Sequence, residues 1–433
     1  MASVELGSPF RLLRRSRDLR LLLGAGLVSM TGDRVLSVGL AYSIYAVTGS
    51  TLASAAALLS AFVPQVVVGS VAGVLVDRWD RKRTMVVTNV LLAVGLVPLL
   101  LVSGDQRIWL VYVVLAVEAC AEVFFAPAEQ AFLPRVVDDA DLVVANGVNG
   151  QMSNLARLVG SALGGVVAAV GGISAVALVD GVSFLVAALL VARIRTDGRV
   201  LSTAETEGGA DEDASEVVRG RLGALVGEWR DGVRTVAANR VVSTLVIALL
   251  VTSTGEGIMG TLFAPYVRHV LHGSGQVYGV ITGVQAIGGL AGGFMVAAVA
   301  DRWSPIAMVW VGSILFGLVD LAIFVYPLVW VNPWPAAAGM VLVGLPGAVV
   351  MAGTMTLFQR HTTDERRGRV FSLMALAQAV SVVVGSTLAG FFGGPSGIIP
   401  ILALQGVGYV VAGLLVLARL GSRAASLDLA PTA

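Results

Sequence analysis

Charged residues are scarce in this chain. Only 13% of its 433 residues are Asp, Glu, Lys or Arg, and 56% are hydrophobic, whereas a soluble domain has about 25% charged residues. The net charge is only +1, so the basic footprint of a nucleic-acid-binding protein is missing. Cys120 is the single cysteine, which excludes a disulfide framework and a cysteine-based metal site. We expect an integral membrane protein with no metal site and no nucleic-acid partner.

Two further absences concern catalysis. The chain has no phosphate-binding loop of the Gly-x4-Gly-Lys type, which argues against ATP-driven transport. It also has no nucleophile–base constellation and no sizeable soluble region, which argues against a membrane enzyme or a receptor. We therefore expect no enzymatic activity and no cofactor.

Polar breaks divide the chain into about twelve apolar segments, each near the 20 residues that cross a bilayer. We therefore expect an all-α integral membrane protein with two six-helix halves, residues 1–192 and 240–418. Residues 193–239 are predicted to be a cytoplasmic linker with an amphipathic helix, and 419–433 a cytoplasmic tail. The expected spans are 19–47, 51–76, 83–103, 108–132, 143–170, 173–192, 240–270, 276–300, 306–326, 334–358, 369–392 and 397–418.

Arginine and lysine gather at alternate breaks. Basic residues precede the first span and recur at residues 78–83, 135, 193–239, 302, 360–369 and 419–423, whereas the opposite set has little beyond Arg107 and Arg268. Because cytoplasmic loops carry the excess of positive charge, both termini are predicted to lie in the cytoplasm of a multi-pass cell-membrane protein.

An internal repeat relates the two halves. Residues 27–36 and 250–259 share a Leu-Val start and a Thr-Gly pair followed by an acid, Asp33 in one half and Glu256 in the other. Residues 76–79 match 300–303, and 159–165 match 384–390, at nearly the same offset. Six spans are therefore duplicated in parallel, which is typical of transporters with a site at the repeat interface.

These motifs resemble the major facilitator superfamily, and within it the branch of macrolide-efflux and enterobactin-exporter-like proteins. The resemblance rests on Gly73 with the run Asp-Arg-Trp-Asp-Arg-Lys-Arg at 77–83. Further matches are Gly32-Asp33, 125–128, 133–134, 145–146, Asp180 with Ser183-Phe184, and 368–371. It implies a monomeric transporter that moves small molecules by alternating access.

The resemblance also implies a gating motif formed by Gly73, Asp77, Arg78, Arg81 and Lys82. In the family, the residues equivalent to Asp77 and Arg81 join a charge network that closes the cytoplasmic side. Two positions depart from the wider pattern. Asp80 stands where a glycine is usual. Ser161 follows Gly160 where drug–proton antiporters usually have proline, and this missing proline argues against an antiporter.

Carboxylates within the spans are the candidate site. Asp33 and Glu256 each lie near mid-membrane, where a charge is costly and its function is the first hypothesis. Desolvation favours the protonated acid, which suits a group that binds and releases protons. A structural role, hydrogen-bonded where the halves meet, is the alternative for both residues.

Span 4 carries Glu118 and Glu122, which share a helix face at a spacing of four. Arg157 in span 5 needs a partner at its depth, and Glu122 is the best candidate, as a switchable or a fixed ion pair. Asp180 and Asp320 are further intramembrane acids, and a structural use is favoured for Asp180.

The leading hypothesis is a secondary transporter that exports amphipathic small molecules, such as drugs, macrolides or siderophore-like compounds, in exchange for protons. Proton-coupled uptake is the alternative, because the same residues serve either direction. A receptor or an enzyme is disfavoured by the repeats. The lipid bilayer, protons and a small-molecule substrate are the expected partners.

Cysteines placed in the linker test the predicted orientation. In a chain with Cys120 replaced by Ser, a cysteine within residues 197–216 should resist an impermeant maleimide added to intact cells and react after lysis. A cysteine at position 104, in a loop predicted to be outside, is the control and should react in intact cells. Efficient labelling of the linker from outside would overturn the orientation.

Overall fold

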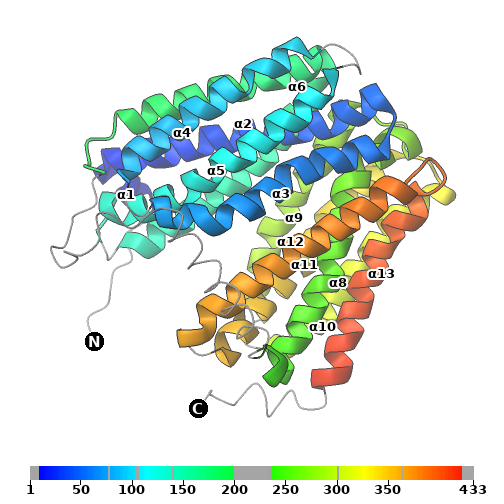
Figure 1. Cartoon of the computed structure of the whole chain (residues 1–433). Coiled ribbons are helices and arrows are strands. Elements are labelled where there is room, and N and C mark those ends of the chain that lie inside the picture. Colours follow the sequence, from blue (N-terminus) through cyan, green and yellow to red (C-terminus); the bar gives the residue numbers. More distant parts are fainter. Residues whose placement is uncertain are drawn as a thin grey trace.

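The chain folds into two helical bundles, one from each half. The structure, a computed structural model, describes residues 9–76, 79–102, 107–138, 141–198, 234, 236–299, 302–362 and 364–421. The bundles meet at one end and diverge toward the end that carries both termini (Figure 1). Most of the expected linker helix, together with Asp77, Arg78 and Asp301, lies outside the described residues.

The N-terminal half begins with a short helix, α1 (Pro9–Arg15). Its long helices are α2 (Arg17–Thr48), α3 (Thr51–Val76), α4 (Arg81–Gly95), α5 (Trp109–Val136) and α6 (Leu142–Ala192). A 3-10 segment, Val97–Leu101, extends α4. Gly172 has a positive φ of 60° inside α6, a conformation open to glycine at little cost, and it divides α6 at the break expected between spans 5 and 6.

The C-terminal half repeats this order. Its helices are α8 (Arg240–Pro265), α9 (Gly275–Val299), α10 (Pro305–Val325), α11 (Pro333–His361), α12 (Asp364–Phe392) and α13 (Ile398–Leu420). A π-helical turn, Tyr266–Val270, continues α8, and a short 3-10 turn, Tyr326–Leu328, follows α10.

Ten helices of the described part are long and apolar enough to cross a membrane. One of them is α6, which the bend at Gly172 divides into two membrane-length segments. The 26-residue α3 adds a further span. The predicted architecture of twelve spans in two six-helix halves is therefore confirmed.

Side-chain caps set several helix starts. Asp80 Oδ1 accepts a hydrogen bond of 2.9 Å from the backbone N–H of Arg83, and so caps α4. This gives a structural use to the acid that replaces the usual glycine. Asn239 caps α8 through the N–H groups of Val241 and Val242. These caps satisfy backbone N–H groups that the first turn of a helix leaves without an intrahelical partner.

Glycine contacts explain the strongest repeated motif. A Cβ atom on Gly160 of α6 would lie 2.6 Å from the carbonyl oxygen of Thr31 in α2. The equivalent Gly385 of α12 meets Thr254 of α8 in the same way. Helices in lipid associate largely through such close backbone packing. The matched sequences at 159–165 and 384–390 therefore build the same helix pair, α2 with α6 and α8 with α12, once in each half.

The two halves join at the end opposite the termini. Gly165 of α6 packs directly against the backbone of Gly275 in α9. A Cβ atom on Gly279 would lie only 2.5 Å from the carbonyl oxygen of Ser161. Thr51 Oγ1 donates to the carbonyl of Gly390, at 3.1 Å, and links α3 to α12. Pairs α6–α9 and α3–α12 therefore form equivalent interfaces between the bundles.

Tyr42 adds a polar contact at the same end. Its hydroxyl donates to the carbonyl of Gly273 at 3.3 Å and accepts from Arg268 Nη1 at 2.9 Å, and its ring stacks on Tyr278 with centroids 6.0 Å apart. One apolar core therefore includes residues of both halves. The cores nearer the termini each draw on one half only.

The glycine contact between α6 and α9 predicts a strong response to one methyl group. Gly165→Ala should destabilise the fold by about 1–3 kcal/mol, because overpacking forces the two backbones apart. Thermal unfolding of the purified protein measures this. Gly289→Ala on α9 is the matched control, since a Cβ there meets no atom within 4 Å and should leave stability unchanged. Equal stability of both variants would contradict the tight contact.

Candidate functional site

A cavity of about 460 Å³ lies inside the N-terminal half, within the range of small-molecule sites. It is lined by side chains of α2, α3, α4, α5 and α6. Four carboxyl groups line it, and the arginine among its lining residues is Arg34. The acids are Asp33, Glu118, Glu122 and Glu129. Its wall is therefore strongly acidic.

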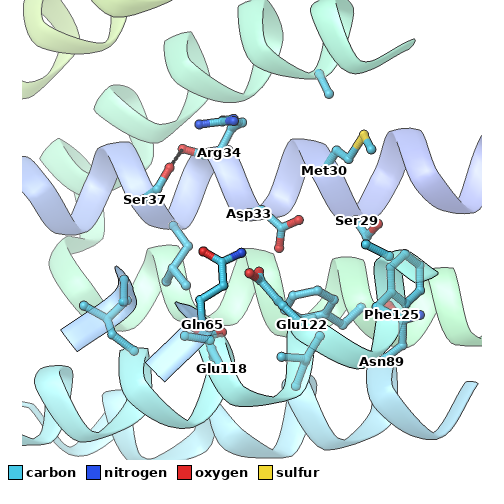
Figure 2. Close-up of a pocket in the computed structure, with 18 of the residues that line it drawn as sticks. Ser29, Met30, Asp33, Arg34, Ser37, Gln65, Asn89, Glu118, Glu122 and Phe125 are labelled. Atoms are coloured by element: carbon cyan, nitrogen blue, oxygen red, sulfur yellow. Dashed lines mark hydrogen bonds between the residues drawn. The ribbon is translucent and has the colours of Figure 1, made fainter. Parts of the chain in front are cut away.

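Asp33 extends from α2 into this space. Figure 2 shows Asp33, Gln65 of α3 and Glu122 of α5 directed toward a shared volume. Asp33 also lies within electrostatic reach of Glu118 and Asp180. Arg34 points to the other side of α2 (Figure 2), as expected for a neighbour rotated about 100° around a helix.

Gly32 positions the helix behind Asp33. A Cβ atom on Gly32 would overlap both Asp180 Oδ1 and Ser183 Oγ of α6. Ser183 donates to Asp180 Oδ1 at 3.0 Å, and Asp180 is fully buried. Gly32 thus leaves room for the Asp180–Ser183 pair behind α2, so the glycine before Asp33 serves a packed helix contact.

Three glutamates of α5 face the cavity together. Glu118 and Glu122 share this face as the spacing of four predicted, and Glu129 lies on it as well. Glu129 was not predicted from the sequence, although its spacing of seven from Glu122 places it two helical turns along the same face. Glu118 is 7% exposed, and its Oε1 has no hydrogen-bond partner among the described residues.

The expected ion pair between Arg157 and Glu122 is not formed within the described part of the chain. Arg157 is exposed, and its Nη2 donates to Asn154 Oδ1 at 3.4 Å. Its charge lies near that of Arg34. The prediction of a fixed pair was wrong, whereas a pair that forms only in another state stays a prediction. Depth along a span can be predicted from the sequence, but the direction in which α6 presents Arg157 depends on how α6 packs against α2.

Glu256 lies in the other half and has different surroundings. Tyr409 of α13 donates to Glu256 Oε1 at 2.6 Å, and Phe316 of α10 stacks on Tyr409 with centroids 4.0 Å apart. Asp320 of α10 lies within electrostatic reach and is 1% exposed. The sequence did not reveal Tyr409 or Phe316, because a lone aromatic residue on an apolar helix carries no distinctive pattern.

The helix pairing around the two acids is nevertheless repeated. A Cβ on Gly255, before Glu256, would lie 2.9 Å from Gln405 Cγ of α13. Gln405 corresponds in the repeat to Asp180, and it is fully buried. Equivalent backbone positions therefore hold an acid in one half and a neutral amide in the other, so that the two halves differ in charge at matching sites.

The structure describes the side chains of only two residues of the predicted gating motif, Arg81 and Lys82. Gly73 lies in a stretch of α3 for which the backbone alone is described, and Asp77 and Arg78 lie outside the described residues. Arg81 Nη1 donates to the carbonyl of Ala131 in α5 at 3.1 Å. Lys82 Nζ donates to the carbonyl of Ile194, just after α6, at 2.6 Å. These two residues therefore tie the start of α4 to α5 and α6.

Two sequence relatives span most of the chain, and a third spans less than half of it. Macrolide efflux protein A of Streptococcus pyogenes is 22% identical over 369 residues, 84% of this chain and 86% of that protein. The putative bacilysin exporter BacE of Bacillus subtilis is 25% identical over 320 residues, 73% and 74% of the two chains. The uncharacterized MFS-type transporter YfiS of Bacillus subtilis is 29% identical, but over 182 residues, 42% of this chain and 43% of that one.

A solved structure of the peptide transporter POT in complex with sulfate shares the fold. Its TM-score is 0.75 at 14% identity, and the match covers 95% of this chain and 96% of that one. The family model described as Major Facilitator Superfamily matches residues 22–244 and again 245–431, once in each half. The chain therefore belongs to the major facilitator superfamily, a family of transporters and not of enzymes.

Proposed function

We propose that this transporter exports amphipathic small molecules across the cell membrane in exchange for protons. The observation that carries the proposal is the acidic cavity, in which Asp33, Glu118, Glu122 and Glu129 meet inside a membrane-spanning bundle. Ionised carboxylates so close together repel one another, which favours shared protonation. A group of this kind can take up protons from one side and release them to the other.

The direction of transport is inferred from the relatives. Two of them are named for efflux or export, of macrolides and of bacilysin. An exporter of this type takes amphipathic molecules from the cytoplasm or the inner leaflet. The basic residues at alternate loops support cytoplasmic termini, and we assign the cell membrane as the location and a monomer as the working unit.

Alternating access follows from how the halves join. The described contacts between them cluster at the end opposite the termini, through Tyr42, Thr51 and Gly165. With cytoplasmic termini, this arrangement corresponds to a state that is closed toward the outside. Export then requires these contacts to break while the gating motif, including Asp77, Arg81 and Lys82, closes the opposite end.

We assign proton coupling to Asp33 with Glu122 and substrate binding to Glu256. Asp33 lies in a cluster of acids that can share protons. Glu256 has a tyrosine donor and a stacked aromatic pair beside it, a setting that suits an amphipathic ligand with a polar or cationic group. Arg157, close to Arg34, adjusts the field of the acidic cluster rather than pairing with Glu122.

Asp33→Asn keeps the side-chain shape but cannot release a proton. Uphill export driven by a pH gradient should be abolished, whereas downhill exchange of a neutral substrate should persist. Substrate-dependent proton flux in liposomes, tested with macrolides, other drugs and siderophores, measures both. Asp138→Asn is the control, because Asp138 is a surface residue whose ion pair with Arg15 is 4.0 Å long. Full proton-driven export by Asp33→Asn would move coupling to the other acids.

Glu256→Gln should act on affinity. Loss of the charge beside Tyr409 should raise KM about tenfold, which corresponds to about 1.4 kcal/mol, with kcat and the proton-to-substrate ratio largely kept. Tyr409→Phe removes the hydrogen bond to Glu256 and should raise KM in the same direction. A Glu256→Gln variant that loses proton coupling and keeps KM would reverse the assignment of the two acids.

A further inference from the structure

A second cavity of about 780 Å³ lies on the exposed side of the N-terminal half, between α4 and α5. We call it the α4–α5 groove. The two helices run side by side on the outer side of the bundle (Figure 1). Its walls are mostly apolar, and several of its side chains are more than half exposed, which in a membrane protein means that they face lipid. They include Val87, Leu91 and Val117.

Polar and aromatic residues mark the end of the groove nearest the termini. Trp79 and Arg83 line it there, and the ring of Trp79 stacks on Phe124 of α5 with centroids 5.8 Å apart. Tryptophan and arginine are typical of the membrane–water interface. The groove therefore runs from the interface into the bilayer core.

The inner end of the groove touches the acidic cavity. Leu92 and Glu118 line both spaces, so the side chains of these two residues form the partition between them. Leu92 lies nine residues beyond Arg83, or about 14 Å along α4 at the usual helical rise. The partition is therefore near the middle of the bilayer, at the depth where a polar group from the membrane would meet the cavity.

Glu118 decides which occupant fits. Its Oε1 is buried without a hydrogen-bond partner among the described residues, and a buried polar atom in this state is costly. A lipid acyl chain supplies no partner. An ammonium group with N–H donors, attached to an apolar body, supplies a hydrogen bond, a positive charge and apolar contact. The carboxyl groups of Glu122 and Asp33 lie next on the far side of the partition.

We propose that the α4–α5 groove is a lateral entrance by which amphipathic cations pass from the bilayer into the acidic cavity, with Glu118 as the residue that receives the cationic group. This inference rests on the proposed export function, because it names the substrate class and the route to the same site. Leu92 is the apolar half of the partition and must move aside for passage.

Photolabelling tests the proposal in the full chain, reconstituted in liposomes. The probes are dodecylammonium with a mid-chain diazirine, whose N–H groups can donate to Glu118, and the matching dodecanol, at equal membrane content. Adducts within residues 87–95 and 117–121 are counted by mass spectrometry. The cation should label these segments about fivefold more than the alcohol, and Glu118→Gln should bring the ratio to about one. Asp138→Asn, a surface control, should keep the wild-type ratio.

Equal labelling by both probes would mean that the groove holds a lipid chain only. A cation preference that survives Glu118→Gln would mean that Glu118 does not receive the cationic group. Either result would overturn the proposal. Ala121→Trp, which fills the groove from its exposed side, tests the route. It should lower the yield of cation adducts on the cavity residues 125–129 about tenfold. Persistent cavity adducts in this variant would overturn the lateral entrance.

Substrate-dependent proton flux in the same liposomes separates this inference from the proposed function. Flux without a charge-dependent preference in the groove would refute the entrance and leave proton-coupled export standing. A Glu118-dependent preference without flux for any compound would leave the cation site standing and refute the export function.

Discussion

Close approach of helix backbones through glycine is the contact on which this structure depends. In lipid there is no hydrophobic drive to bring one helix against another, so packing must be supplied by surfaces that fit. Gly160 and Gly385 bring α6 to α2 and α12 to α8, and Gly165 with Gly275 brings the halves together. These glycines fix which faces of each helix remain free to line a cavity.

The free faces carry the charges. Three glutamates of α5 and Asp33 of α2 point into a space that the helix pairs leave open. Most intramembrane acids of the described residues lie on such inner faces, because facing lipid would expose an ionisable group to hydrocarbon. The acidic cavity is thus a consequence of packing as much as of composition, and its charge is concentrated in one half of a duplicated fold.

The duplication is structural, and the chemistry has diverged. Gly32 and Gly255 accept a side chain from the last helix of their own half in the same way, yet that side chain is Asp180 in one half and Gln405 in the other. Asp33 faces other acids, whereas Glu256 accepts a hydrogen bond from Tyr409. A shared backbone can therefore hold a cluster of acids in one half and, at the equivalent position of the other half, an acid hydrogen-bonded to a tyrosine.

The sequence by itself determined the twelve spans, their parallel repeat, the break at Gly172 and the acid after each Thr-Gly pair. These follow from hydropathy, helical rise and glycine, which act locally along the chain. Only the tertiary structure decided that Glu129 joins the acidic cavity, that Arg157 lies by Asn154 and Arg34 instead of Glu122, and that Tyr409 reaches Glu256. Depth in the membrane is a one-dimensional property that a sequence carries. The direction of a side chain around its helix, and the neighbour it meets there, depends on crossing angles set by contacts between residues far apart in the chain.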